Sequence, residues 1–314
     1  MKLLINIFRL LRPRQWIKNF AIFAAITFSG ELFNFQIFEK VLLGFFVLCA
    51  VSSATYIVND ILDVKSDRLH PFKRFRPLAQ SVVPIYIAVF LALSFVVVSL
   101  YISIFYITLS FFVTIIFYLC LQVLYSTFLK SIAVADILII AAGYILRVYA
   151  GEFASGFHIS VWMLLTVISL SLFLAVGKRR SELTLVSRIK NAHIADVRKT
   201  LSHYSERLLD VYATLFATST FVFYSLFTFL ENPQGFRLGI SILLTDYLPN
   251  FFYKKWLMIT IAPVVFGLMR YIQDIYEKSE GESPENVLLS DKPLLGTVIL
   301  WIFLVISIIY FINS

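Results

Sequence analysis

The sequence is poor in charge. Of its 314 residues, 15% are Asp, Glu, Lys or Arg, whereas soluble domains carry about 25%. Hydrophobic residues make up 60% of the chain, and a soluble fold would have to bury most of them in one core. The scaling of surface with volume does not allow such a core. The shortage of charge therefore excludes an ordinary soluble protein.

Cysteine and histidine are also scarce, with two and four residues respectively. Cys49 and Cys120 both lie in apolar runs, so we expect small core residues and not a disulfide or a metal pair. No His or Cys pair suits the role of general base or nucleophile. The chemistry of this chain must depend on other residue types.

Long apolar runs are abundant. They are continuous over roughly 20 residues, which predicts membrane-spanning helices and not the alternating segments of a barrel. Residues 2–12 have the pattern of an amphipathic helix at the membrane interface, and no small-residue cleavage site follows them. We find no repeat and no Pro/Ser/Gly-rich linker, so residues 1–314 are expected to form one membrane domain. About nine spans are predicted, at 17–36, 41–60, 83–102, 104–124, 132–150, 160–177, 208–230, 256–273 and 294–312.

The basic residues predict the topology. With a cytoplasmic N-terminus, 22 of the 27 Lys and Arg residues fall in cytoplasmic segments, four in outer loops, and Arg147 inside a span. This split follows the positive-inside rule, and it accounts for the net charge of +8 without a nucleic-acid partner. The loops 61–82, 178–207 and 274–293 are then cytoplasmic and are expected to cap an active site, in a protein of the plasma (inner) membrane.

The most polar stretch of the chain directly follows the second predicted span. Asp60, Asp63 and Asp67 are spaced i, i+3, i+7 and therefore share one helix face within about 60°, with Asn59 beside them. Three carboxylates on one face repel one another unless a cation lies between them, and hard oxygen ligands suit Mg²⁺. We predict a magnesium site here, although a solvated helix end would give a similar pattern.

Basic residues follow these acids at once. Guanidinium and ammonium groups donate hydrogen bonds to phosphate oxygens, so acids followed by bases indicate a metal-bound, phosphate-bearing ligand. The residues concerned are Arg68, Lys73, Arg74 and Arg76.

Two charged residues are expected inside one span. Asp136 and Arg147 are eleven residues apart, about 16 Å along one face of a helix, and ionisable groups at this depth usually face a polar cavity. Arg147 reaches either a phosphate or an acid on another helix, and the sequence does not decide between them.

The motif NDxxDxxxD, formed by Asn59, Asp60, Asp63 and Asp67, resembles the first aspartate motif of the UbiA superfamily of intramembrane prenyltransferases. Further blocks resemble its decaprenyl-phosphate phosphoribosyltransferase branch over residues 12–285. They are RPRQWIKN (12–19), VNDILDVKSDRLHPFKRFRPLA (58–79), YSTFLK (125–130), YILRVYAG (144–151), GKRRSEL (177–183), RKTLSHY (198–204), LMRYIQD (268–274) and GESPE (281–285).

The second half of the expected site departs from the general superfamily. Members of the superfamily carry a second aspartate motif after the sixth span, whereas this chain has Lys178, Arg179 and Arg180 there, with Glu182 as the only nearby acid. Cations in place of carboxylates favour one metal and an additional phosphate, as in phosphoribosyl diphosphate. The alternative is that these three residues only end a span on the cytoplasmic side.

The resemblance implies a UbiA-like helical bundle that transfers 5-phosphoribose from phosphoribosyl diphosphate to a membrane polyprenyl phosphate, with Mg²⁺ as cofactor. It implies Asp60, Asp63 and Lys178 as catalytic residues, and Asn59, Asp60, Asp63 and Asp67 as metal ligands. The expected substrate-binding residues are Lys18, Asn19, Arg68, Lys73, Arg74, Arg76, Tyr125, Lys130, Arg147, Lys178, Arg179, Glu182 and Tyr204.

Two other functions and the oligomeric state stay open at this point. A UbiA-type prenyltransferase acting on an aromatic or other small acceptor is the alternative enzyme, and the missing second aspartate motif argues against it. A transporter would have ionisable residues along a path through the spans, whereas here they gather at one membrane face. The sequence leaves a homo-oligomer open.

Overall fold

The computed structural model describes residues 2–69, 73–188, 199–231, 255–277 and 284–312. Within these ranges the chain is helical and contains no strand, as expected. The long helices are α3 (Phe35–Leu69), α4 (Ile85–Ile102), α5 (Leu109–Thr127), α6 (Ala135–Ser155), α7 (Val161–Arg188), α9 (Glu206–Leu230), α11 (Ile261–Glu277) and α13 (Lys292–Ser307). The shorter ones are α1 (Lys2–Leu10), η1 (Pro13–Phe23), α2 (Ala24–Phe28), η2 (Lys73–Phe75), η3 (Ser103–Ile107), η4 (Leu129–Ser131), η5 (Lys199–His203), η6 (Trp256–Thr260), α12 (Pro284–Ser290) and η7 (Ile308–Ile312).

Eight helical segments of the described chain are long and apolar enough to cross a membrane. They coincide with eight of the nine predicted spans. The first predicted span, 17–36, differs because it is built from the 3₁₀ segment η1 followed by the short helix α2. The tighter winding of a 3₁₀ helix gives about 2.0 Å per residue, so η1 and α2 together rise roughly 30 Å.

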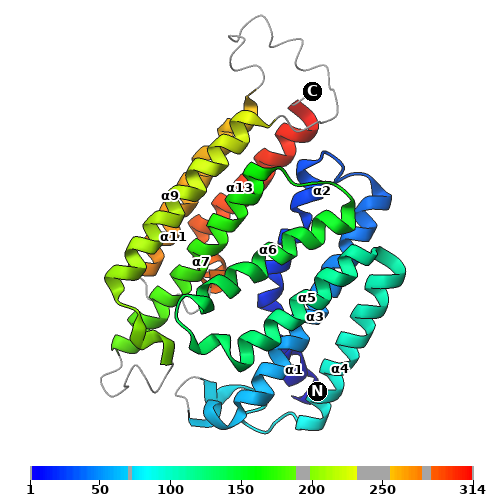
Figure 1. The fold of residues 1–314 in the computed structure, drawn as a ribbon, viewed down its shortest axis with the longest axis vertical. Helices are drawn as coiled ribbons and strands as arrows, with labels where there is room; N and C mark the ends of the chain where they lie inside the picture. The colour runs from blue at the N-terminus through cyan, green and yellow to red at the C-terminus, as the bar shows by residue number, and fades with distance from the viewer. Residues whose placement is uncertain (1, 70–72, 189–198, 232–254, 278–283, 313–314) are drawn as a thin grey trace, which may run out of the picture.

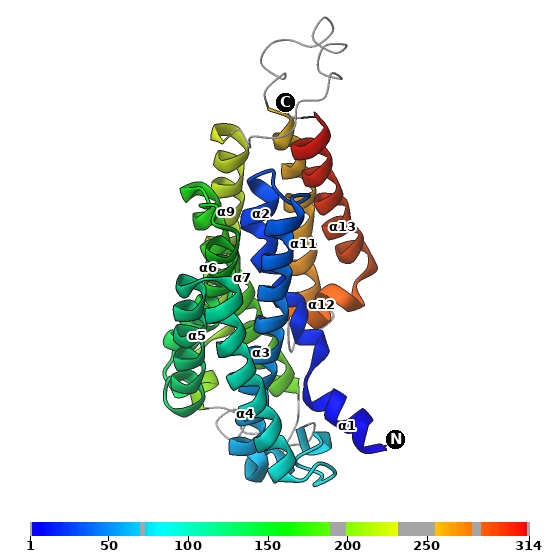
Figure 2. The same cartoon turned by 90° about the vertical axis from the view of Figure 1, so that its right-hand side faces the viewer.

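The helices run side by side along the long axis of the molecule (Figure 1). α1 and η7 lie at opposite ends of this bundle (Figures 1 and 2). The ends of α3 and α7 lie towards the same end of the bundle as α1 (Figure 1). The two polar motifs of the sequence are therefore brought to one end of the bundle.

Large apolar side chains cover the outer faces of α4 and α5, as expected of helices that meet lipid. Phe90, Val97 and Phe117 are among the exposed ones. The prediction for the cysteines was half wrong, because Cys49 is buried while Cys120 is exposed. Cys120 lies on α5, where an outward face can hold a small apolar thiol as readily as the core can.

The three polar segments that the sequence suggests as loops are partly helical in the structure. α3 continues to Leu69 and α7 to Arg188, so loops 61–82 and 178–207 are shorter than expected. The segment 274–293 contains the end of α11 and all of α12. Residues 70–72, 189–198 and 278–283 of these segments lie outside the described ranges. The helical spacing assumed for the three aspartates is confirmed.

One close approach holds η1 against α6. A Cβ atom at Gly151 would lie 1.9 Å from the backbone oxygen of Ile22, a distance that no side chain can accept. Asn19 and Ile22 of η1 are fully buried. Glycine at position 151 therefore fixes the broken first segment, which carries Gln15, Lys18 and Asn19, against the core of the bundle.

Candidate active site

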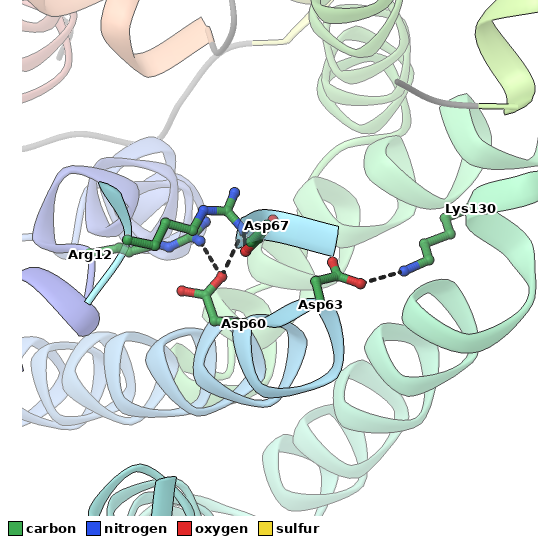
Figure 3. A network of polar contacts seen from close by, with 6 residues as sticks. Arg12, Asp60, Asp63, Asp67 and Lys130 are labelled. Atoms are coloured by element: carbon green, nitrogen blue, oxygen red, sulfur yellow. Dashed lines mark hydrogen bonds and ion pairs between the residues drawn. The ribbon is translucent and has the colours of Figure 1, made fainter. Parts of the chain in front are cut away.

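The acidic face of α3 lies against arginines from two other segments (Figure 3). Arg12 donates to Asp60 Oδ1 at 2.5 Å, and Arg76 Nη1 lies 3.0 Å from Asp60 Oδ1 and 2.7 Å from Asp67 Oδ2. Asp60 and Asp67 are 2% and 3% exposed, so their charge is compensated mainly by these arginines. The two carboxylates converge on a single cationic nitrogen.

Asp63 points elsewhere. Its Oδ1 accepts a hydrogen bond from Lys130 Nζ at 3.2 Å (Figure 3), beside the segment η4. Within the described part of the chain, no group of three or more His, Cys, Asp or Glu residues is arranged to hold a metal ion. The donor set nevertheless fits Mg²⁺ in chemistry, because two buried carboxylates already share one cation and hard oxygen ligands are what this ion prefers.

The other basic residues of the motif lie farther from the acids. Arg68 donates to the backbone oxygen of Ala79 at 3.1 Å and to Ser81 Oγ at 2.9 Å, so it holds the following loop on α3. Arg74 is exposed and lies over the Phe75 ring. The side chain of Lys73 lies outside the described set. Of the basic residues in this stretch whose side chains are described, only Arg76 contacts the aspartates.

At the end of α7, three adjacent cations point to different neighbours. Arg179 is fully buried and pairs with Asp136 at 2.6 Å and with Glu182 at 2.5 Å. Arg180 turns towards α9, where it lies 2.8 Å from Asp210 and 3.0 Å from Glu206. This divergence follows from the turn of about 100° between successive helix residues.

Lys178 has neither a hydrogen bond nor an ion pair to another described residue. It is half-buried and lies in the electrostatic neighbourhood of Glu182, Tyr125 and Lys18. Tyr125 accepts a hydrogen bond from Arg179 at 3.2 Å. Among the three cations of α7, Lys178 is the one that remains available to an anionic ligand.

Tyr204 lies beside the buried ion pair of α7. Its hydroxyl donates to Asp136 Oδ1 at 2.7 Å and accepts from the backbone nitrogen of Val134 at 2.6 Å. Burial, together with the adjacent Asp136 carboxylate, raises the pKa of the Tyr204 hydroxyl. Tyr204 therefore fixes Asp136, and through it Arg179.

A second polar cluster joins η1 to α12. Lys18 Nζ lies 3.0 Å from Glu285 Oε2 and donates to Gln15 Oε1 at 2.7 Å. Gln15 also donates to Glu285 and accepts from Tyr56 at 3.0 Å. Arg12 stacks over the Tyr56 ring at 5.0 Å, so this cluster is continuous with the acidic face of α3.

Sequence reasoning missed several members of this arrangement. Arg12, Gln15 and Glu285 were quoted only as parts of the RPRQWIKN and GESPE blocks, and Tyr56 was not singled out. The signal that could have found them is that these blocks carry polar residues next to apolar spans. Burial acts to raise the pKa of Glu285, but the nearby ammonium of Lys18 outweighs it and the pKa is lowered.

Arg147 lies deeper in the bundle among neutral groups. It donates to Asn19 Oδ1 at 2.7 Å, to Tyr118 at 2.9 Å and to the backbone oxygen of Gly143. Its described hydrogen bonds include no carboxylate, so the pairing with an acid of another helix that the sequence left open is not seen. Asn19 and Arg147 form one buried network.

The aspartate face of α3 and the basic end of α7 both fall within the match to a known protein family. The model of the UbiA prenyltransferase family matches residues 20–286. This chain belongs to the UbiA family.

Curated UbiA relatives cover nearly the whole chain. A decaprenyl-phosphate phosphoribosyltransferase from Mycolicibacterium smegmatis is 35% identical over 98% of this chain and 93% of its own length. The protein of the same description from Mycobacterium tuberculosis is 33% identical over 96% of this chain and 93% of its own length.

Solved UbiA structures share the fold at lower identity. A UbiA homolog from Archaeoglobus fulgidus bound to GPP and Mg²⁺ has a TM-score of 0.66 and 18% identity, covering 97% of this chain and 99% of the homolog. Membership of the UbiA family, together with eight helices of the described residues that are long and apolar enough to cross a membrane, makes this chain an integral membrane protein.

Proposed function

We propose that this protein transfers 5-phosphoribose from phosphoribosyl diphosphate to a polyprenyl phosphate of the membrane and releases diphosphate. The observation that carries the proposal is that an acidic stretch of α3 and a basic stretch of α7 lie towards the same end of the bundle (Figure 1). The full-length similarity to proteins described as decaprenyl-phosphate phosphoribosyltransferases supports it. Decaprenyl phosphate or a similar lipid is the acceptor, and the product is a precursor for a lipid-linked arabinose donor in cell-wall synthesis.

The acidic end of α3 is the proposed site for the diphosphate of the donor. Asp60 and Asp67 would hold Mg²⁺, with Asn59 and Asp63 beside them, and the homolog solved with GPP and Mg²⁺ supports a divalent metal in this fold. When bound, the ion would supply Lewis-acid neutralisation of the leaving group. Arg12 and Arg76 already contact the carboxylates, so both are within reach of a diphosphate held there.

The basic end of α7 is the proposed site for the second polyanion. Lys178 offers an ammonium without an ion pair in the described chain, and the neighbouring Arg179 donates a hydrogen bond to Tyr125. Lys130, which pairs with Asp63, is the further cation that we assign to this site. Holding two polyanions against each other is the main task of such a site, and preorganised cations do this without reorganisation.

The reaction needs no general base. The bond between C1 of the ribose and the diphosphate oxygen breaks, and its electron pair leaves with the diphosphate. C1 gains positive charge, and an oxygen of the lipid phosphate forms the new C1–O bond from the opposite face. The lipid phosphate is already an anion at pH 7.

The cellular arrangement is part of the same proposal. We infer that the protein lies in the plasma (inner) membrane with its N-terminus and site on the cytoplasmic side, where the soluble donor is present. Residues 1–314 act as one domain capped by 61–82, 178–207 and 274–293, and a homo-oligomer is compatible with it.

The direct test supplies purified protein with radiolabelled phosphoribosyl diphosphate, a polyprenyl phosphate and Mg²⁺. We expect a labelled lipid, and a loss of roughly 100-fold in the Asp60→Asn variant because the metal and Arg12 lose their shared carboxylate. Glu206→Gln is the control, since Glu206 pairs with Arg180 outside the site. No labelled lipid, or equal product from Asp60→Asn, would contradict the proposal. Product from prenyl diphosphate donors alone would favour the prenyltransferase.

A further inference from the structure

The buried carboxylate of Glu285 has hydrogen-bonding capacity that its described neighbours do not use. Glu285 is 3% exposed, and its Oε1 accepts from Gln15. Its Oε2 lies 3.0 Å from the Lys18 ammonium but accepts no well-directed hydrogen bond from any described residue. A carboxylate oxygen can accept more than one hydrogen bond, so beside the Lys18 ammonium Oε2 keeps capacity for a ligand that donates a hydrogen bond.

The charges around Glu285 narrow the chemistry of that ligand. Lys178 lies in the electrostatic neighbourhood of both Glu285 and Lys18, and it has no ion pair within the described chain. A carboxylate acceptor next to an unpaired ammonium suits a molecule with hydroxyl donors on one side and a phosphate on the other. A prenyl chain carries no hydroxyl and could not satisfy Glu285.

The depth of the cluster agrees with this chemistry. Tyr56 donates to Gln15 at 3.0 Å and lies on α3 four residues before Asp60, which is about 6 Å along the helix. Gln15, Lys18 and Lys178 each retain some exposed surface, so the cluster is not sealed. A ribose whose diphosphate lies at Asp60 therefore has Tyr56, the nearest member of this cluster, about one helical turn away.

We propose that Glu285, oriented by Gln15 and Lys18, accepts hydrogen bonds from the ribose hydroxyls of the donor while Lys178 binds its 5-phosphate. This inference rests on the proposed function and deepens it, since it assigns the recognition of a sugar over a prenyl group to α12 and η1. Glu285 thus determines which donor is bound and takes no part in breaking the bond at C1.

The test compares phosphoribosyl diphosphate with its 2-deoxy and 3-deoxy analogues as donors, in wild type, Glu285→Ala and Glu285→Gln. We expect wild type to prefer the full ribose by roughly 10- to 100-fold in kcat/KM for at least one of the two positions. In Glu285→Ala this preference falls below about threefold. Glu285→Gln keeps an acceptor oxygen and the side-chain shape, so it gives an intermediate preference and carries the test if the alanine variant does not fold.

Asp291→Asn is the matched control. Asp291 is a buried carboxylate that pairs with Arg270 at 2.8 Å and accepts from the backbone nitrogen of Leu294 at the start of α13, and its substitution should leave the preference unchanged. If the Glu285 variants lose activity with all donors by the same factor, or if wild type shows no preference, the inference is overturned while the proposed function stands. If wild type labels no lipid with any donor, the proposed function itself is overturned.

Discussion

At the end of α3 the buried groups are acids and their partners are partly exposed cations, whereas at the end of α7 a buried cation is matched by a buried acid. The side chains of Arg12 and Arg76 are 24% and 23% exposed against 3% for Asp60. Arg179 and Asp136 are both completely buried. The pairs at α3 can exchange partners when a ligand arrives, while the pair at α7 is a fixed part of the fold.

The largest expected effect tests the fixed pair. Arg179→Met leaves Asp136 buried without its cation, and removing one partner of such a pair costs about 3–5 kcal/mol. We expect a strong fall in the thermal unfolding midpoint in detergent. The double variant Arg179→Met with Asp136→Leu should recover most of the stability, because the charge that remains, that of Glu182, is partly exposed to solvent. A double variant as unstable as the single one would show that Arg179 is held mainly by other contacts.

The next effect separates adjacent cations of α7. Lys178→Met should raise KM for the donor by roughly 10- to 100-fold, the value of one charge-assisted hydrogen bond, with an unchanged unfolding midpoint. Arg180→Met is its control, since Arg180 pairs with Glu206 and Asp210, and should leave KM as it is. Equal KM changes in the two variants would place both cations outside the site, or both within it.

A smaller effect concerns the exchangeable pairs of α3. Arg76 competes with any metal for Asp60 and Asp67, so Arg76→Gln should lower the Mg²⁺ concentration for half-maximal activity about fivefold, on the order of 1 kcal/mol. Turnover should fall at the same time, because the guanidinium of Arg76 no longer donates hydrogen bonds to the phosphate oxygens of the substrate. A Mg²⁺ titration of activity measures both. An unchanged or higher Mg²⁺ requirement would mean that Arg76 and the metal do not share these carboxylates.

The smallest effect is a pH dependence. Because the folded pKa of Glu285 is lowered from its ordinary value of 4.5, its pair with Lys18 stabilises the protein fully above pH 4.5. This stabilisation is lost as the pH falls through the lower folded pKa. Wild type should therefore lose on the order of 1–2 °C of unfolding midpoint in that range relative to Glu285→Gln. If the unfolding midpoints of wild type and Glu285→Gln change with pH in parallel, the ionisation of Glu285 does not stabilise the fold.

The acidic motif was predictable because its information is local. The spacing of Asp60, Asp63 and Asp67 fixes a shared face on any helix, and α3 indeed continues through all three. Local spacing did not reveal that Asp63 turns away towards Lys130, since that depends on where η4 lies. The interface helix expected for residues 2–12 appears as α1, which ends two residues before Arg12.

The partners of the site were less predictable because they come from distant segments. Gln15 and Glu285 are separated by 270 residues, and no periodicity within either segment points to the other. The three neighbouring cations of α7 look alike in the sequence, yet Arg179 pairs with Asp136 of α6, Arg180 pairs with α9, and Lys178 has no ion pair within the described chain. The first span was expected as one helix because its apolar length is right, but hydropathy does not distinguish a 3₁₀ segment from an α-helix.

The contact between Gly151 and Ile22 has a consequence for the evolvability of this protein. η1 carries Gln15 and Lys18, so any side chain added at position 151 would displace them from Glu285 although it lies outside the polar cluster itself. Saturation mutagenesis should therefore find position 151 as intolerant as the aspartates of α3. Changes of donor specificity that act through Glu285 would then arise on α12, which also packs against α13 and α7.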